Sequence, residues 1–289
     1  MAAVLSTAMA ATMLLTGSIS VQAADAAAAN DPAVELIFTS VSVSGDSHTE
    51  AMYEFADKVE ELSGGSVTCK CYDNGSLFSS ENEFDALLNG DADLAYISFP
   101  TIATQIPSYS MFASGYLFSS YEHMTSVLNG DIGLNKIRPQ IEETLNIKPL
   151  SSFYLGSRVI NTREKEINSY DDMNGLLLRM PNSEAWLFLG EALGANPTPL
   201  SFSELYTALQ TGAVDAQDNP LPSIESAKFY EVTKYIAITN HVVDSIMPCI
   251  NGDTWNSMTE AQQEAVTEAM EYARDVNDTA RLRSEEHTS

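Results

Sequence analysis

Residues 174–220 read NGLLLRMPNSEAWLFLGEALGANPTPLSFSELYTALQTGAVDAQDNP, and this stretch decides the fold. The apolar run 176–178 predicts a buried strand, and the strand ends in a charged residue, Arg179. Two good N-cap residues follow, and the apolar spacing of residues 184–193 predicts a helix closed by Gly194. In open α/β sheets, ligands bind beyond the carboxyl ends of the strands and against the helix N-termini that follow. Arg179 is therefore placed to meet an anion.

Strand and helix patterns alternate along the rest of the chain, which favours α/β lobes with substantially parallel sheets. The periodicity predicts strands at 35–43, 66–72, 94–98, 148–154 and 213–217, and helices at 48–62, 81–88, 226–235 and 259–281. Residues 236–250 read as one or two strands that could cross between lobes. A chain of 289 residues has room for two lobes of about 100 to 150 residues each.

A weak internal repeat also indicates two similar lobes. Residues 84–93, FDALLNGDAD, align with residues 206–215, YTALQTGAVD. Each reads as a helix end, a glycine stop and an aspartate that leads into a strand. The alternative, that any βαβ unit with a glycine C-cap looks like this, stays open. Residues 201–204, SFSE, match a capping box that opens the second of these helices.

The charge balance excludes one class of partner. The chain carries 14 basic and 40 acidic residues, for a net charge of −26, whereas nucleic-acid binding depends on Lys and Arg that neutralise phosphates. The same charge disfavours anionic membrane surfaces and repels anionic ligands on average. An anion would need local cations in a desolvated cleft, and the chain has only seven arginines from which to supply them.

Residues 1–24, MAAVLSTAMAATMLLTGSISVQAA, resemble a secretory signal peptide with a small-residue cleavage site. The positively charged start of such a signal is missing, since no Lys or Arg precedes Lys58. No cysteine lies near the cleavage site, so a lipid anchor is not indicated. We therefore expect an exported, periplasmic protein from which residues 1–24 are removed as a cleaved signal peptide.

The last seven residues, RSEEHTS, correspond to one reading frame of a common sequencing-adapter oligonucleotide. We therefore expect the natural sequence to stop matching near Leu282, with its true C-terminal segment lost. Resequencing the source DNA through this point tests the hypothesis.

The three cysteines are Cys69, Cys71 and Cys249. The first two share one face of a predicted strand, so they are not expected to bond to each other. Two alternatives stay open: a disulfide from Cys249 to one of them, or three buried thiols.

The common catalytic signatures are absent. The chain has no GxGxxG, GxxxxGK[ST], HExxH, GxSxG or CxxC motif, and its four histidines show no metal-ligand spacing. We expect no enzyme activity, no cofactor and no metal. The polar set that does stand out consists of Arg158, Arg179 and Asn219, each of which is expected to follow a different strand. Two guanidinium groups and one amide match a carboxylate, although both arginines could equally pair with acidic residues of the chain.

Several segments resemble the extracytoplasmic solute-binding subunit of TRAP transporters, the DctP type. They are GSR at 156–158, DMNGLLLRMPN at 172–182, GANPTPLSFSELYTALQTGAVD at 194–215, QDNP at 217–220 and AKFYEV at 227–232. The resemblance covers roughly residues 35–280. It implies a two-lobed periplasmic binding-protein fold, type II-like, with the ligand cleft between the lobes. It also implies delivery of an organic acid to an integral membrane permease driven by an ion gradient.

The resemblance implies roles for individual residues. Arg179 matches the arginine that clamps the ligand carboxylate, and Arg158 and Asn219 match positions that complete the clamp in sialic-acid-binding members. Phe202 matches an aromatic residue that packs on the ligand, and Asn182 matches a further polar contact. A sugar acid or other hydroxylated carboxylate is the expected ligand, and the protein is expected to be a monomer. The first-lobe candidates Ser42, Ser44, His48 and Ser98 lie near predicted strand ends, where each could equally be a turn or capping residue.

Together with the signal peptide at 1–24 and the adapter-derived segment at 283–289, the resemblance gives the expected boundaries. They are lobe 1 at 33–155 plus about 245–262, lobe 2 with the clamp at 156–244, and a truncated C-terminal helix at 263–282. Two alternatives stay open. The receptor of an ATP-driven importer would share the fold and the compartment, and a secreted α/β enzyme is the reading from a different class.

Overall fold

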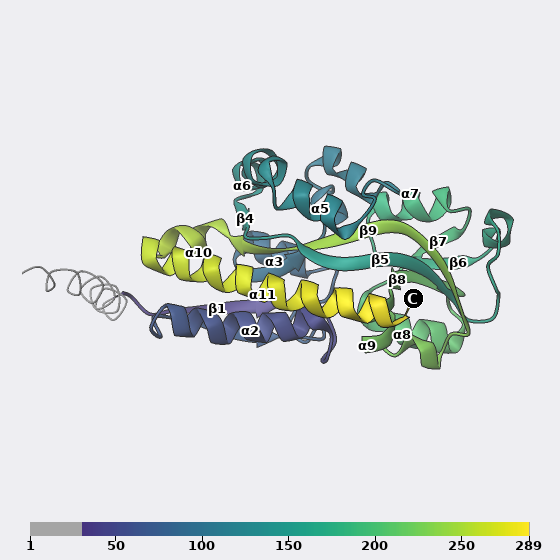
Figure 1. The fold of residues 1–289 in the computed structure, drawn as a ribbon, viewed down its shortest axis with the longest axis horizontal. Helices are drawn as coiled ribbons and strands as arrows, with labels where there is room; N and C mark the ends of the chain where they lie inside the picture. Colours follow the sequence, from purple (N-terminus) through teal and green to yellow (C-terminus); the bar gives the residue numbers. More distant parts are fainter. Residues whose placement is uncertain (1–30, 289) are drawn as a thin grey trace, which may run out of the picture.

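The computed structural model describes residues 31–288, so the predicted signal peptide at 1–24 lies outside the described residues. The predicted two-lobed α/β architecture is confirmed (Figure 1). The first lobe contains β1 (Val34–Thr39), α2 (Ser47–Leu62), β2 (Val67–Tyr72), α3 (Glu83–Asn89), β3 (Leu94–Ile97), α4 (Phe99–Ile102), η1 (Pro107–Ala113), α5 (Tyr121–Leu128), η2 (Gly133–Ile137), α6 (Arg138–Leu145) and β4 (Ile147–Pro149). The second lobe contains η3 (Tyr170–Met173), β6 (Leu177–Met180), α7 (Glu184–Ala192), β7 (Asn196–Pro199), α8 (Phe202–Thr211), β8 (Ala216–Pro220), α9 (Leu221–Ser226) and η4 (Phe229–Glu231).

The strands form a continuous sheet in the order β2-β1-β3-β9-β5-β8-β6-β7, and β4 also pairs with β9. Within the first lobe, β1 runs parallel to β2 and β3. Within the second lobe, β6 runs parallel to β7 and β8. These parallel pairs confirm the expectation from the alternating pattern, because parallel neighbours need a crossover connection such as a helix.

Two long strands, β5 (Phe153–Thr162) and β9 (Tyr235–Asn251), connect the lobes. The C-terminal part of β9 pairs antiparallel with β3 and β4, and its N-terminal part pairs with β5. The prediction that residues 236–250 cross between lobes is therefore confirmed, by one strand rather than two.

After α10 (Gly252–Ser257), the helix α11 (Glu260–Thr288) runs along both lobes. Figure 1 shows it lying across the molecule, beside α2 and β5, with its C-terminal end close to α9. Its apolar side chains Val266, Ala269, Met270 and Ala273 are fully buried. The helix thus contacts both lobes, as far along as Glu285, which accepts from Tyr154 and Ser157 of β5. The adapter origin of its last residues stays a prediction.

Each lobe has its own apolar core. In the first lobe, Leu36 and Phe38 of β1 pack with Phe55 of α2, and the two phenyl rings meet edge to face at 5.8 Å. In the second lobe, Leu178 and Met180 of β6 pack with residues of α7. Alternate residues of a strand point to the same face, so Arg179 between these two must point to the other side of the sheet.

The aligned segments of the internal repeat form the same structure in both lobes. Helices α3 and α8 end at Gly90 and Gly212, which adopt left-handed conformations with φ of 77° and 81°. A residue with a Cβ would be strained at both positions, which explains the shared glycine. The predicted capping box at 201–204 does not form: Ser201 is the N-cap of α8, but its hydroxyl contacts Ser203 instead of a backbone N–H.

Some predicted elements differ from the structure in type or in extent. Residues 226–235 do not form a helix, because α9 ends at Ser226 and Lys228 takes a left-handed φ of 56° before the short η4 turn. The predicted strand 148–154 is split between β4 and β5. The predicted strand 213–217 is instead β8, which continues to Pro220.

Candidate functional site

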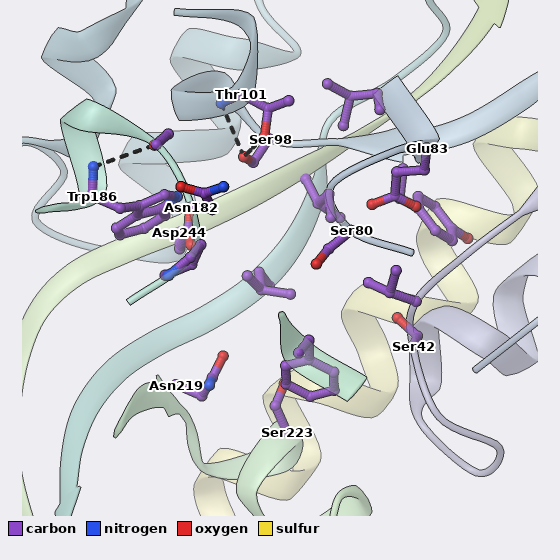
Figure 2. Close-up of a pocket in the computed structure, with 18 of the residues that line it drawn as sticks. Ser42, Ser80, Glu83, Ser98, Thr101, Asn182, Trp186, Asn219, Ser223 and Asp244 are labelled. Atoms are coloured by element: carbon purple, nitrogen blue, oxygen red, sulfur yellow. Dashed lines mark hydrogen bonds between the residues drawn. The ribbon is translucent and has the colours of Figure 1, made fainter. Parts of the chain in front are cut away.

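A cavity of about 160 Å³ lies between the two lobes. All five residues that the sequence predicts for a ligand site line this cavity: Arg158, Arg179, Asn182, Phe202 and Asn219. Figure 2 shows labelled side chains of both lobes around the space, with Asn182, Trp186 and Asp244 on one side and Ser42, Ser80 and Glu83 on the other.

Arg158 lies within β5, not beyond the end of a strand as predicted. The reason is Gly156, whose φ of 122° accompanies a register shift in the pairing of β5 with β9. A glycine inside a strand often marks such a bulge. In the sequence alone, this glycine looks like the end of a strand. Asn219 likewise lies within β8, opposite Val159 of β5.

The guanidinium group of Arg158 is held by two carboxylates of the chain. Its Nε donates to Asp244 at 2.7 Å, and its Nη1 donates to the Asp218 carbonyl at 2.8 Å and lies 3.3 Å from the Asp218 carboxylate. Burial alone would lower the pKa of Arg158, but the two carboxylates raise it above its ordinary value. The cation also lies 4.3 Å from the centre of the Trp186 ring. For Arg158, the alternative of pairing within the chain is therefore correct.

Asp218 and Asp244 respond differently to this shared partner. Burial raises the pKa of Asp244, and the attraction of Arg158 does not fully offset it. Burial would also raise the pKa of Asp218, but Arg158 and a contact with His241 hold it below its ordinary value. Asp218 is thus a carboxylate at neutral pH, so the charge of Arg158 is compensated.

Arg179 stands in the opposite electrostatic situation. It is 3% exposed, and its Nε donates to the carbonyl of Leu200 at 2.8 Å. Among residues 31–288, no carboxylate oxygen lies within 4.0 Å of its guanidinium nitrogens. Burial lowers the pKa of Arg179 to about 10, so the group stays cationic at neutral pH. Arg179 is therefore a buried cation that lacks a close anionic partner.

The other three predicted residues surround this cation in different ways. The ring of Phe202 lies 5.9 Å from the Arg179 guanidinium. The Asn219 amide donates to Gln217 at 2.6 Å, which fixes its orientation. Asn182 lines the cavity and leaves helix capping to Ser183, whose hydroxyl accepts from Trp186 N.

The first-lobe wall was predicted only in part. Of the four candidates, Ser42 and Ser98 line the cavity, whereas Ser44 and His48 do not. The polar residues of this wall that were missed include Ser80, Glu81 and Glu83. The sequence offered little to find them, because two acidic residues in a chain with 40 such residues carry no distinguishing pattern.

A third buried arginine joins the lobes beside the cavity. Arg281 of α11 pairs with Asp46, and it donates to the carbonyl of Leu155 and to Ser223 of α9. Asp46, which caps α2 in the first lobe, also accepts from Ser226 of α9 at 2.8 Å. This cluster connects both lobes with the C-terminal helix.

No group of three or more His, Cys, Asp or Glu side chains suited to a metal ion occurs within residues 31–288. Cys69, Cys71 and Cys249 are free thiols, so the disulfide alternative is not seen. In the same residues, no helix combines the length and the apolar character needed to cross a membrane.

Comparison with known proteins gives consistent matches. The family model described as bacterial extracellular solute-binding protein, family 7 (DctP), matches residues 38–288. The sialic acid-binding periplasmic protein SiaP of Vibrio cholerae is 33% identical over 222 residues, which cover 77% of this chain and 68% of SiaP.

Two solved structures share the fold. A TRAP periplasmic solute-binding protein from Roseobacter denitrificans with bound 3-deoxy-D-manno-oct-2-ulosonic acid has a TM-score of 0.83 and 38% identity, covering 88% of this chain and 83% of that one. The sugar acid-binding protein DctPAm from Advenella mimigardefordensis in complex with galactonate has a TM-score of 0.84 and 28% identity, covering 89% and 82%.

Proposed function

Because this chain belongs to the bacterial extracellular solute-binding proteins of family 7, we propose that it is the solute receptor of a TRAP transporter and binds a hydroxylated organic monocarboxylate between its lobes. The observation that carries the proposal is the state of Arg179: a buried cation at the cavity wall without a close carboxylate from the described part of the chain. A buried charge is costly unless it is paired, and a ligand carboxylate supplies the pair.

Arg179 holds the ligand through its two terminal nitrogens. Its Nε is already fixed by the Leu200 carbonyl, which orients the planar guanidinium for a two-pronged contact with a carboxylate. Arg158 assists with its remaining nitrogen, Nη2, while Asp218 and Asp244 keep its position. Asn219 and Asn182 add polar contacts, and Phe202 covers the ligand beside Arg179.

The chemistry of the cavity and the ligands of the relatives agree on the class of acid. The relatives described above are named for sialic acid, or were solved with 3-deoxy-D-manno-oct-2-ulosonic acid and galactonate, all of which join a carboxylate to several hydroxyl groups. The hydroxyl groups of Ser42, Ser80 and Ser98 line the first-lobe side of the cavity. Since a water needs roughly 10–15 Å³ of such space, the cavity has room for on the order of ten waters, or a small sugar acid.

The lobes of this receptor correspond to residues 33–155 plus about 245–262 and to residues 156–244. The pairing of β9 supports these limits, because its residues up to Ile246 pair with β5 and those from Met247 pair with β3. We assign residues 1–24 to a cleaved signal peptide that leads to the periplasm, where the loaded receptor meets its integral membrane permease. Family 7 consists of solute-binding proteins, which favours this role over that of a secreted enzyme.

A thermal-shift screen of the purified protein tests the proposal. Sialic acid, 3-deoxy-D-manno-oct-2-ulosonic acid, galactonate, glucuronate and succinate are each added, with the amide of every positive acid as its matched control. A ligand at 100 times its Kd stabilises the folded state by about 2.7 kcal/mol, or several degrees in Tm. We expect one or more hydroxylated acids to raise the Tm and their amides to leave it unchanged. A flat panel from a folded protein contradicts the proposal, as does an equal response to the amides.

A further inference from the structure

Besides Asp46, which pairs with Arg281, the first-lobe wall of the cavity carries two acidic residues: Glu83, the first residue of α3, and Glu81, just before its N-cap. Figure 2 shows the Glu83 carboxyl on the same side as Ser80 and Ser42, across the cavity from Asn182 and Trp186. The other charged residues of the lining form the ion pairs Arg158–Asp244 and Arg281–Asp46, so Arg179 faces Glu81 and Glu83 as a cation without an ion pair of its own among the described residues. Nothing in the proposed carboxylate contact uses this acidic end.

Glu83 has an unsatisfied polar atom in this wall. The residue is 8% exposed, and its Oε2 is buried without a hydrogen-bond partner among the described residues. Leaving a buried oxygen unpaired costs about 1–3 kcal/mol, which a ligand hydroxyl at this point would recover. Burial, and secondarily the nearby Glu81, raises the pKa of Glu83 well above its ordinary value, which favours the protonated carboxyl, a group that can both donate and accept.

Glu81 is the exposed member of the pair and accepts from Ser80 at 3.1 Å. It acts on Arg179 across the cavity, because it is one of the charges that work against the lowering of the Arg179 pKa. A ligand with a second carboxylate at this end would bring one more negative charge close to Glu81. Placing like charges together costs several kcal/mol, whereas an uncharged hydroxyl meets no such penalty.

We propose that Glu83 is a specificity-determining residue: its carboxyl hydrogen-bonds a hydroxyl at the end of the ligand remote from the carboxylate, while the charge of the neighbouring Glu81 disfavours acids that carry a second carboxylate there. The inference rests on the proposed function, since it presumes a carboxylate at Arg179. It narrows the substrate class to monocarboxylates with a hydroxylated tail.

Isothermal titration with two matched pairs of acids tests this inference. Galactonate is compared with galactarate, and gluconate with glucarate. The members of each pair differ only at the carbon farthest from the shared carboxylate, which is a primary alcohol in the first and a second carboxylate in the other. The proteins are the wild type, Glu83→Leu, the double variant Glu81→Gln/Glu83→Gln, and the control Glu122→Gln. Glu122 is an exposed glutamate on α5 that does not line the cavity.

We expect the wild type to bind at least one monocarboxylate about tenfold or more tighter than its dicarboxylate partner. In the double variant that ratio falls by about tenfold, mainly because the dicarboxylate gains affinity. Glu83→Leu weakens the monocarboxylate by about tenfold, as expected for a lost buried hydrogen bond. The control keeps the wild-type ratio, and Tm values without ligand establish that each variant is folded.

The failures of the two proposals look different. A wild type that binds a monocarboxylate and its dicarboxylate equally, or a ratio that is unchanged in the double variant, overturns the role of Glu83 and leaves the receptor standing. A folded wild type that binds none of the four acids, nor any acid of the thermal-shift screen, overturns both.

Discussion

The surroundings of Arg158 and of Arg179 differ sharply, although both side chains are almost fully buried in the same wall of one cavity. Arg158, 4% exposed, contacts two buried carboxylates and an indole ring. Arg179, 3% exposed, donates to the carbonyl oxygen of Leu200 and lies 5.9 Å from the centre of the Phe202 ring. The pKa of the first is raised and that of the second is lowered. The comparison teaches that a charge compensated by the chain supports structure, whereas an uncompensated one is available to a ligand.

The largest expected effect is on stability, through Arg158. Arg158→Met removes the partner of Asp218 and Asp244 and leaves two carboxyl groups buried without their cation. Breaking a buried ion pair from one side costs about 3–5 kcal/mol, so the free energy of unfolding should fall by that amount. Urea denaturation at pH 7.5 without ligand measures it.

The matched control is Arg274→Met, because Arg274 lies on α11 and pairs with the exposed Asp275. Exposed pairs contribute about 0–1 kcal/mol, so this variant should remain close to the wild type. A loss in Arg158→Met no larger than in Arg274→Met would mean that the Asp218–Arg158–Asp244 group does not stabilise the fold.

Arg179 should show the reverse pattern. Arg179→Met removes a buried cation that has no close partner, so the free energy of unfolding without ligand should stay the same or rise. Binding of the acid found in the thermal-shift screen should weaken by about 100-fold or more, or about 2.7 kcal/mol. Arg179→Lys keeps the charge but loses the planar fork, and should lie between the wild type and Arg179→Met.

Calorimetric titration and urea denaturation of the same samples check both halves of this prediction. Unchanged affinity in Arg179→Met would end the carboxylate-clamp proposal. A large drop in stability would show instead that Arg179 is a structural residue like Arg158.

This contrast marks how far the sequence could predict the site. The apolar run before Arg179 and the caps after it place that residue at the end of β6, and the local pattern was enough. The position of Arg158 was wrong because a bulge at Gly156 looks like a strand end in one dimension. Its pairing could not be predicted, since Asp218 and Asp244 reach it only through the pairing of β5 with β8 and β9.

The first-lobe wall shows the same limit more strongly. Nothing in the sequence around Glu83 indicates that it is buried at the cavity, which depends on where α3 lies relative to the space between the lobes. Local periodicity carries no information on that position. The overall architecture could be predicted because it follows from the alternation of strand and helix patterns and from the glycines that end helices. The specificity of the cavity depends instead on tertiary contacts.

A third arginine, Arg281, extends the comparison. Like Arg158, it is buried and paired with a carboxylate, here Asp46. It also contacts the Nδ1 atom of His48 at 2.6 Å, and His48 itself is 1% exposed. Because arginine can only donate, this contact favours a neutral ring whose Nδ1 accepts, although Nδ1 also lies 3.2 Å from the carboxylate of Asp46. Burial, and secondarily Arg281, lowers the pKa of His48 to about 4.

The smallest expected effect follows from this neutral ring and is a pH dependence. An unfolded chain takes up a proton at His48 below about pH 6.5, whereas the folded protein does so only near pH 4. The unfolded state therefore binds more protons in this window, and the stability contributed by neutral His48, complete above pH 6.5, is lost as the pH falls toward 4.

Between pH 7.5 and pH 5, the free energy of unfolding of the wild type should fall by about 2 kcal/mol more than that of His48→Asn, whose amide can accept from Arg281 but does not titrate. Urea denaturation of both proteins at the two pH values gives the difference, in which carboxylates common to both cancel. His123→Asn, a change at an exposed histidine of α5, should keep the wild-type dependence. If His48→Asn loses as much stability as the wild type, His48 is not held neutral, and the contact with Arg281 does not repeat the compensated environment of Arg158.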